Sequence, residues 1–282
     1  MFGFLNVNKP IDMTSHDVIS VLRKITKIKQ IGHSGTLDPF AEGVLPVAIG
    51  KATRLIEFLD DDKEYLAQVS FGKNTSTYDI EGDVVFESGK MVCRDEVVEA
   101  LKNFEGEILQ MPPLYSAIKV RGKKLYEYVR EGKSVEVSPR KVFIKSIELK
   151  SFDEENQLAE ILICCSKGTY IRSIAYDLGK ILSSGAFLSK LVRVRAGNFK
   201  IEDSVTLDEL KNGVEDHIFI PKFSLAQYEI SDDEHEKILH GQFLKVENNF
   251  SDGDTIILTY NNEISATAKI DKDLIKVKKV FR

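Results

Sequence analysis

The densest group of residues that could do chemistry lies between Gly32 and Leu55, in the string GHSGTLDPFAEGVLPVAIGKATRL. Its first eight residues are mostly turn formers and polar residues, which predicts a loop. Asp38 in this loop precedes a proline, which favours an extended backbone at the aspartate. A carboxylate on a loop held by a rigid scaffold could act as a nucleophile or stabilise a developing charge. Taken alone, an Asp-Pro pair more often only caps a turn.

Two other kinds of site fit the sequence less well. Gly43 and Gly50-Lys51 superficially resemble a phosphate-binding loop, but six residues separate the glycines instead of four, and Ala52 follows the lysine. The five histidines and three cysteines are scattered, without the spacing of a zinc site or of a disulfide framework. We therefore expect no phosphate loop and no metal site, and we expect the cysteines to be small buried residues.

A second functional signal is the basic segment from Lys119 to Lys150. It carries ten lysines and arginines against four acidic residues, a local charge of +6 in a chain whose net charge is −5. Nucleic-acid binding depends on where the charge lies, so an acidic chain is not excluded from binding RNA. On charge alone, a solvated surface explains this segment equally well.

The composition of the chain is that of a globular protein, with 282 residues, of which 43% are hydrophobic and 29% are charged. No apolar run approaches the roughly 18 residues that a membrane-spanning helix needs. The first residues lack the basic leader and the apolar stretch of a signal peptide. We therefore expect a cytoplasmic protein that has no membrane partner.

Helices and strands on either side must position the loop that carries Asp38. Thr14 and Asp17 have capping-box spacing, and apolar residues then recur with a helical period, which predicts a helix over 15–25. Strands are predicted over 3–7, 65–71, 142–152 and 157–166, and further helices around 97–101, 125–132 and 169–182. Since helices and strands are interspersed without strict alternation, we expect an α+β fold around a mixed or antiparallel sheet.

The character of the chain changes after Phe223. Three short β-like runs, 255–260, 264–270 and 274–280, are separated by polar turns. We expect residues 1–224 to form the main domain and residues 225–282 to form a small all-β domain.

The string around Asp38 resembles the signature of the TruB family of pseudouridine synthases, G-H-x-G-T-L-D-P-x-A-x-G-V-L-P. Further blocks resemble other motifs of this family and follow in the expected order. They are Leu5–Pro10 with Met13–Ser15, Lys63–Tyr65, Thr77–Gly82, Pro112–Val120 and Lys167–Ser173. The resemblance implies a pseudouridine synthase catalytic domain. The closing segment resembles the small RNA-binding domain of the PUA type that many members carry.

The resemblance implies a reaction and a role for each matching residue. Members isomerise uridine to pseudouridine without a cofactor, by breaking the N1–C1′ bond, rotating the base and rejoining it through C5. Asp38 falls on the catalytic aspartate of the family. Arg172 falls on an arginine that pairs with this aspartate, and we expect it to lower the carboxyl pKa. Tyr65 falls on a tyrosine that stacks against the target base.

Five further residues fall on positions in or around the family's active site. His33 falls on a histidine that fills the space left when the uridine leaves its stack. Leu191 falls on an apolar residue of the pocket wall. Tyr170 and Lys9 fall on other pocket positions, and Asp79 belongs to the polar T-x-D element. The resemblance implies that all five take part in binding the substrate.

The basic segment overlies an insertion with which the family grips RNA, where phosphate contacts supply affinity without reading sequence. The residues expected to contact RNA are Lys119, Arg121, Lys123, Lys124, Arg140 and Arg193. Members often have two consecutive arginines after the leucine of the pocket wall, whereas Val192 precedes Arg193 here. The sequence thus departs from the family pattern at this point.

In its size and in lacking a long basic tail, the chain resembles the bacterial stand-alone enzyme. That enzyme modifies uridine 55 in the TΨC loop of tRNA. The resemblance therefore implies an isomerase that binds the tRNA T-stem-loop without an obligate protein partner. Two alternatives remain: an RNA-binding or RNA-folding protein that retains only the fold, and a carbohydrate-active enzyme. The latter would usually need a second carboxylate about 5–9 Å from Asp38, and the sequence offers no clear candidate.

Overall fold

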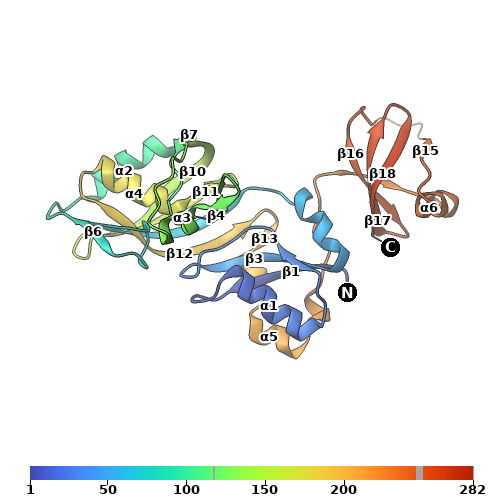
Figure 1. Ribbon diagram of the computed structural model, residues 1–282, viewed down its shortest axis with the longest axis horizontal. Helices are drawn as coiled ribbons and strands as arrows, with labels where there is room; N and C mark the ends of the chain where they lie inside the picture. The colour runs from blue at the N-terminus through green and yellow to red at the C-terminus, as the bar shows by residue number, and fades with distance from the viewer. Residues whose placement is uncertain (117, 246–249, 282) are drawn as a thin grey trace.

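The computed structural model describes residues 1–116, 118–245 and 250–281. Ala117 of the 112–120 motif, and residues 246–249 and 282 of the expected C-terminal domain, lie outside these described residues. Figure 1 shows an elongated molecule, with a larger part made of a sheet and helices and a smaller β-rich part formed by the C-terminal residues.

The larger part is built around a nine-stranded sheet in the described chain. Its strands are β1 Gly3–Lys9, β2 Ile31–His33, β3 Glu42–Ile49, β4 Lys63–Phe71, β7 Gly106–Gln110, β10 Arg140–Asp153, β11 Leu158–Cys165, β12 Ala186–Ala196 and β13 Phe199–Lys200. Their order is β1-β3-β12-β4-β11-β10-β7, with β2 beside β3 and β13 beside β12. The β3–β12 pair is parallel and the other pairs are antiparallel. This mixed sheet confirms the expected α+β fold.

Helices cover the sheet in two groups. The helices α1 Ser15–Thr26 and α5 Leu207–Asn212 pack their apolar side chains on β1 and β3. The helices α2 Arg94–Leu101 and α4 Ile171–Ile181 pack on β4, β10 and β11. The capping box expected at the start of α1 is present, because the Thr14 hydroxyl and the Asp17 carboxylate each accept a backbone N–H of the other residue, at 3.0 and 2.9 Å.

The strand β3 explains the apolar run that follows the Asp38 loop. Leu45, Val47 and Ile49 face α1 and α5, whereas Val44 and Ala48 face the opposite side of the sheet. A strand buried on both faces reads as a continuous apolar sequence, without the alternation that marks a half-exposed strand.

Two local expectations are corrected by the structure. The segment 32–39 was expected to be a loop throughout, but Gly32 and His33 belong to β2 and pair with Ala48 and Val47. Cys93 was expected to be buried and is exposed, whereas the other two cysteines are buried. Cys93 is the N-cap residue of α2 at the surface, whereas Cys164 and Cys165 lie in β11 within the sheet.

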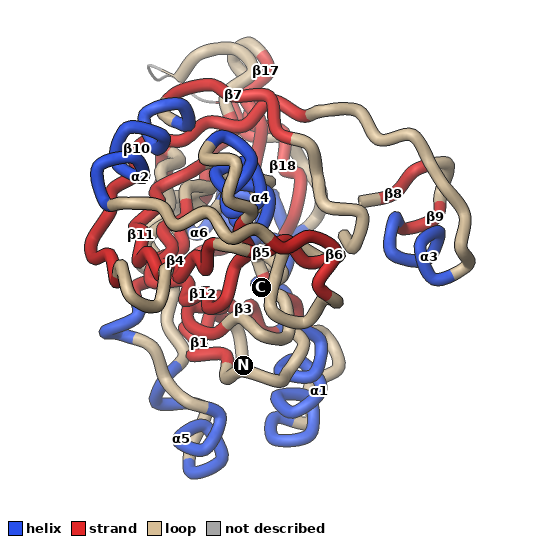
Figure 2. The backbone as a smooth tube through the Cα atoms, turned by 90° about the vertical axis from the view of Figure 1, so that its left-hand side faces the viewer, coloured by secondary structure: helices blue, strands red, loops and turns tan. Residues whose placement is uncertain are grey.

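Residues 118–139, called the arm below, extend away from the sheet (Figure 2). The arm contains the short strands β8 Lys119–Val120 and β9 Lys123–Lys124 and the helix α3 Leu125–Arg130. This helix lies where the sequence predicts one. The chain enters the arm from β7 and leaves it into β10, which are neighbouring strands at one edge of the sheet.

The smaller part begins at Ala226, and its described residues form a five-stranded sheet in the order β14-β16-β17-β18-β15. Its elements are β14 Ala226–Glu229, α6 Asp232–Leu239, β15 Leu244–Lys245, β16 Thr255–Tyr260, β17 Glu263–Asp271 and β18 Leu274–Val280. Three of these strands match the predicted runs. Ile257, Ile264 and Phe281 share an apolar cluster with Phe4 and Val44, so the two parts are packed together and not merely linked.

None of the helices in the described parts of the chain combines the length and the apolar character needed to cross a membrane.

Candidate active site

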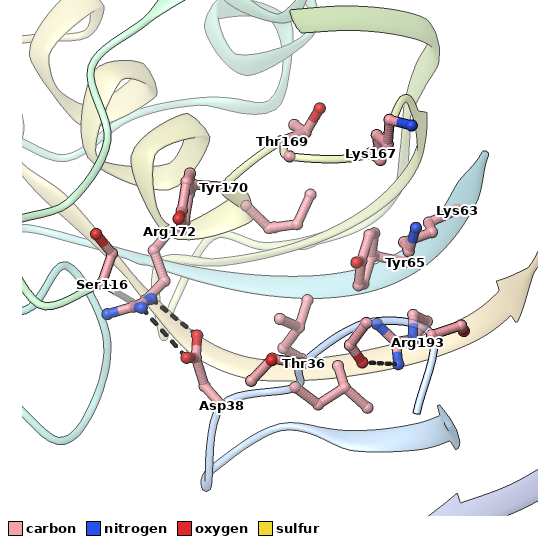
Figure 3. Close-up of a pocket in the computed structure, with 16 residues that line it drawn as sticks. Thr36, Asp38, Lys63, Tyr65, Ser116, Lys167, Thr169, Tyr170, Arg172 and Arg193 are labelled. Carbon is pink, nitrogen blue, oxygen red and sulfur yellow. Dashed lines mark hydrogen bonds and ion pairs between the residues drawn. The ribbon is translucent and has the colours of Figure 1, made fainter. Parts of the chain in front are cut away.

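A cavity of about 310 Å³ opens beside the loop that carries Asp38. This volume is at the lower end of the range for small-molecule sites. The wall is formed by that loop, the strands β4 and β12, and the residues that lead into α4 (Figure 3). The lining residues are Ser34, Gly35, Thr36, Leu37, Asp38, Lys63, Tyr65, Ser116, Lys167, Gly168, Thr169, Tyr170, Ile171, Arg172, Leu191 and Arg193.

Asp38 and Arg172 form an ion pair at one end of the cavity (Figure 3). Arg172 Nε lies 3.0 Å from Asp38 Oδ2, and Arg172 Nη2 lies 3.3 Å from Oδ1. The two groups therefore meet side-on, which fixes the plane of the carboxylate. The arginine side chain is only 6% exposed, whereas that of Asp38 is 36% exposed. The carboxylate thus keeps one side open to the cavity.

A second carboxylate holds Arg172 from behind. Asp79 Oδ2 lies 3.0 Å from Arg172 Nη1, and its Oδ1 accepts hydrogen bonds from the Thr77 hydroxyl and the Glu81 backbone N–H. The carbonyls of Thr77 and Tyr115 accept two further hydrogen bonds from the guanidinium. Because these partners all belong to the protein, the position of the arginine does not depend on a bound substrate.

The pKa of Asp38 is subject to opposing effects. Burial raises the pKa of this carboxyl above its ordinary value, while Arg172 lowers it and Asp79 raises it further. Arg172 thus lowers this pKa, as expected, but burial has the larger effect and the net shift is upward. Removing water from the carboxylate outweighs the attraction of one arginine that is shared with a second carboxylate.

The Asp38 loop is fixed by buried polar groups beneath it. Lys9 is fully buried and donates hydrogen bonds to the carbonyls of Pro10, Met13 and Pro39, at 2.8, 2.5 and 3.3 Å. The Ser15 hydroxyl accepts the Leu37 backbone N–H at 2.8 Å. Burial lowers the pKa of Lys9 to about 8, even though Asp38 raises it. The charge of this lysine therefore begins to be lost just above neutral pH.

Arg193 on β12 also fixes the Asp38 loop. Its Nη2 donates to the Gly35 carbonyl at 3.0 Å and its Nε donates to the Val44 carbonyl at 2.6 Å. Gly43, with φ +104°, allows this close approach, because a Cβ there would lie 2.4 Å from the Arg193 carbonyl oxygen. Only glycine fits such a contact without moving the backbone.

The aromatic side of the cavity comes from Tyr65 and Tyr170, with Leu191 on the neighbouring strand. Burial raises the pKa of Tyr65 and of Tyr170, so both phenols are neutral at pH 7. The Gln110 side chain holds Tyr170 by two hydrogen bonds, donating to its carbonyl at 3.0 Å and accepting its N–H at 2.7 Å. These rings offer flat apolar surfaces on which a base can stack.

The structure separates the eight candidate active-site residues into two sets. Asp38, Tyr65, Tyr170, Arg172 and Leu191 line the cavity. Lys9 and Asp79 were also expected to bind substrate, but they are 0% and 2% exposed and lie behind the wall. Their side chains position Pro39 and Arg172 instead. His33 lies at the end of β2 outside the cavity wall, and burial lowers its pKa, so its ring is neutral.

The residues expected to contact RNA also differ in exposure. Lys119, Arg121 and Arg140 are exposed, and Lys123 and Lys124 are partly exposed. Arg193 is 1% exposed, and its guanidinium already binds two backbone carbonyls. It therefore supports the Asp38 loop from inside while also lining the cavity, and its expected contact with a phosphate stays a prediction.

Sequence reasoning assigned no individual role to several cavity residues, among them Lys63, Lys167 and Ser116. The alternation of β4 could have revealed Lys63, because it lies two positions before Tyr65 and so shares its face. Ser116 is 5% exposed beside Arg172, and it lies within the Pro112–Val120 block, where its role was not singled out. No group of three or more His, Cys, Asp or Glu that could hold a metal ion occurs in the described parts of the chain.

Comparison with known proteins places this geometry in a family. Residues 23–171 match the model of the TruB family pseudouridylate synthase N-terminal domain, and residues 172–218 match that of the tRNA pseudouridylate synthase B C-terminal domain. The chain is 43% identical over 291 residues to tRNA pseudouridine synthase B of Carboxydothermus hydrogenoformans, covering 100% of this chain and 99% of the relative. It is 40% identical over 294 residues to the protein of the same name from Streptococcus gordonii, covering all of both chains.

Solved structures agree with this assignment. The chain is similar to a chain of an H/ACA RNP bound to a substrate RNA containing 2′-deoxyuridine, with a TM-score of 0.74 and 28% identity over 100% of this chain and 85% of that one. It is also similar to a chain of a Cbf5-Nop10-Gar1 complex, with a TM-score of 0.73 and 30% identity over the same shares. The protein with the Asp38–Arg172 pair described above therefore belongs to the TruB family of pseudouridylate synthases, which are isomerases.

Proposed function

We propose that this protein is a tRNA pseudouridine synthase that isomerises uridine 55 in the TΨC loop, with Asp38 as its catalytic carboxylate. The observation that carries the proposal is the side-on Asp38–Arg172 pair, at 3.0 and 3.3 Å, at the end of a cavity walled by Tyr65 and Leu191. Relatives named tRNA pseudouridine synthase B match the chain over its whole length, which supports tRNA as the substrate.

The reaction places simple demands on the site. The uridine must leave its stack and enter the cavity, where Tyr65 and Leu191 sandwich the uracil ring. His33, whose pKa is lowered by burial, then fills the space that the base leaves. The Asp38 carboxylate then stabilises or attacks the sugar or base while the N1–C1′ bond breaks, and Arg172 holds its oxygens in place. The freed uracil rotates within the cavity, C5 bonds to C1′, and the hydrogen on C5 is then lost as a proton while N1 gains one.

Two functional units follow from the proposal. Residues 1–224 act as the catalytic domain, and residues 225–282 act as a PUA-like domain that adds RNA contacts. The arm, with Lys119, Arg121, Lys123 and Lys124, grips the T-stem-loop, and Arg140 lies at its exit. The enzyme acts alone in the cytoplasm, without a cofactor or an obligate protein partner.

The geometry argues against a carbohydrate-active enzyme, because Asp79 near Asp38 is unsuited to be its second catalytic carboxylate. Asp79 is near Asp38, since both bind Arg172, but it is 2% exposed and already accepts three hydrogen bonds. It cannot reach a glycosidic oxygen or a water in the cavity, as a second catalytic carboxylate would have to do.

The test is tritium release from an unmodified tRNA transcript labelled at uridine C5, with the wild type and Asp38→Asn compared in parallel. We expect release by the wild type alone, and mapping of the product to position 55. Tight RNA binding by both proteins with release by neither would contradict the proposal and favour an RNA-binding protein that retains only the fold.

A further inference from the structure

The cavity has two chemically different ends. Asp38 and Arg172 lie at one end, whereas Lys63, Lys167 and Arg193 lie at the other (Figure 3). The isomerisation itself requires groups at the first end only. Arg193 already donates to two backbone carbonyls, whereas Lys63 and Lys167 have no role in that step and lie where an anion could bind.

Lys63 is the most constrained of these cations. It is half-buried at the start of β4, and its Nζ donates to the Asp61 backbone carbonyl at 3.1 Å. Within residues 1–116, 118–245 and 250–281, no carboxylate oxygen lies within ion-pair distance of this Nζ. Burial lowers its pKa, Arg193 and Lys167 lower it further, and Asp61 raises it. An anion placed here would relieve the repulsion among the three cations.

Lys167 is held only weakly by the protein. Its Nζ lies 2.5 Å from Asp61 Oδ2, but the two side chains are 71% and 58% exposed. Exposed ion pairs of this kind contribute little and exchange readily. Asp61 thus supplies one replaceable negative charge at an end of the cavity that holds three positive ones.

The distance from Tyr65 to Lys63 matches the distance from the base to the phosphate of a nucleotide. Lys63 and Tyr65 are two residues apart on one strand, so their side chains share a face and their Cα atoms lie about 6.6 Å apart along it. A base stacked against Tyr65 carries its sugar and phosphate outward by a similar distance. Arg193 adds charge from below, but its nitrogens bind the Gly35 and Val44 carbonyls.

We propose that Lys63 and Lys167 form a phosphate subsite, which binds a phosphodiester group flanking the uridine that enters the cavity. The inference rests on the proposed function and deepens it by giving the bound nucleotide a second fixed point. Asp61 occupies Lys167 in the free enzyme and releases it when the phosphate arrives. The base is then held at Tyr65 and the backbone at Lys63, which orients the N1–C1′ bond toward Asp38.

The experiment uses synthetic T-stem-loop RNAs in which one linkage, either 5′ or 3′ of the target uridine, is a neutral methylphosphonate. Affinity is measured with the full-length Asp38→Asn protein, so that no RNA is consumed. We expect one of the two neutral linkages to weaken binding roughly 5- to 10-fold. Lys63→Gln should weaken binding of the unmodified RNA by a similar factor, and the two changes together should do no more than either alone.

The subsite would be overturned if the affinity loss from Lys63→Gln multiplied with the loss from the neutral linkage at both positions. It would also be overturned if Lys63→Gln bound the unmodified RNA with unchanged affinity. Lys63→Arg keeps the charge and should retain both the affinity and the response to the neutral linkage. Thermal unfolding of each variant shows whether it is folded. If Lys63→Gln fails to fold, Lys167→Gln supplies the same comparison at an exposed position.

Two further variants sharpen the test. Lys102→Gln removes a lysine that is 65% exposed and 2.5 Å from Glu99, a close match to the Lys167–Asp61 pair but outside the cavity. It should keep the wild-type affinity and the full response to the neutral linkage. Asp61→Asn should strengthen RNA binding about two- to threefold by freeing Lys167. Weaker binding would contradict the exchange of Asp61 for phosphate.

Failure of the subsite and failure of the proposed function give different results. If the wild type releases tritium but the affinity losses from Lys63→Gln and from each neutral linkage multiply, the subsite alone is overturned. No release, combined with clear coupling between Lys63 and one linkage, would overturn the proposed function and leave the phosphate contact supported.

Discussion

Arg172 and Lys123 are both cations that pair with carboxylates, yet their surroundings are opposite. The Arg172 side chain is 6% exposed and is shared between Asp38 and Asp79. The Lys123 side chain is 31% exposed in the arm and shares Glu131 with Lys133. Breaking a buried pair typically costs about 3–5 kcal/mol, whereas an exposed pair contributes about 0–1 kcal/mol.

The two regions therefore have different roles. The catalytic end is held by groups that have no alternative partner, so its geometry is present before RNA arrives. The arm carries charges whose internal pairs are weak, so phosphate groups can replace them. Changes at the first region should therefore reduce turnover at unchanged affinity, and changes at the second should do the reverse.

The largest effect is expected for Asp38→Asn. The amide is nearly isosteric but cannot carry a negative charge, so turnover should fall by at least roughly 10⁴-fold. RNA affinity should stay close to that of the wild type. Single-turnover tritium release and filter binding measure the two quantities. Lost binding in this variant would show that Asp38 has a structural role.

Arg172→Lys should reduce turnover by about 10²–10³-fold, since lysine cannot hold two carboxylates with a planar fork. Stability should also fall, because Asp79 loses a partner while buried. The readouts are single-turnover rate and thermal unfolding. A variant with a normal rate would contradict the positioning of Asp38 by this arginine.

Replacing Lys123 and Lys124 together with glutamate should weaken RNA binding by more than about tenfold and flatten its salt dependence. The rate at saturating RNA should remain that of the wild type. Affinities at several salt concentrations provide the test. An unchanged salt slope would remove this part of the arm from the RNA interface.

Turnover should also depend on pH, with smaller effects on the acidic and alkaline sides than those of the substitutions above. Ionised Asp38 is required, so turnover should decline as the pH falls through a pKa that lies above the ordinary value of 3.8. On the alkaline side, Lys9 loses its proton near its pKa of about 8 and then has fewer N–H groups for three carbonyls. Turnover should therefore fall by up to about tenfold between pH 8 and 9. A flat alkaline limb would separate Lys9 from the Asp38 loop.

The sequence alone identifies which segments meet at the cavity, but not which side chains reach it. The string around Asp38 and the segments of Tyr65, Arg172 and Leu191 are recognisable by their motifs, and all four residues line the cavity. A motif does not reveal burial. For that reason the sequence did not reveal that Lys9, Asp79 and Arg193, each expected to contact substrate or RNA, are almost completely buried.

Secondary structure follows the same division. Local signals suffice for α1, whose capping box and apolar period are strong, and for β16, whose bounds match the predicted run. They fail for Gly32 and His33, which become strand residues only because β3 offers free backbone groups beside them. The raised pKa of Asp38 likewise depends on how much of the fold surrounds the carboxylate, and spacing in the sequence does not record that.

The parallel contact between β3 and β12 has a consequence for how the molecule acquires activity. It joins Glu42 to Val192 and Gly43 to Arg193, and it places Arg193 under the Asp38 loop. Contacts between segments so distant in the chain form slowly, because a long loop must close before they add stability. In refolding experiments, turnover should therefore return later than the bulk of the β-sheet circular dichroism signal, and the catalytic loop should be among the last parts of the protein to mature.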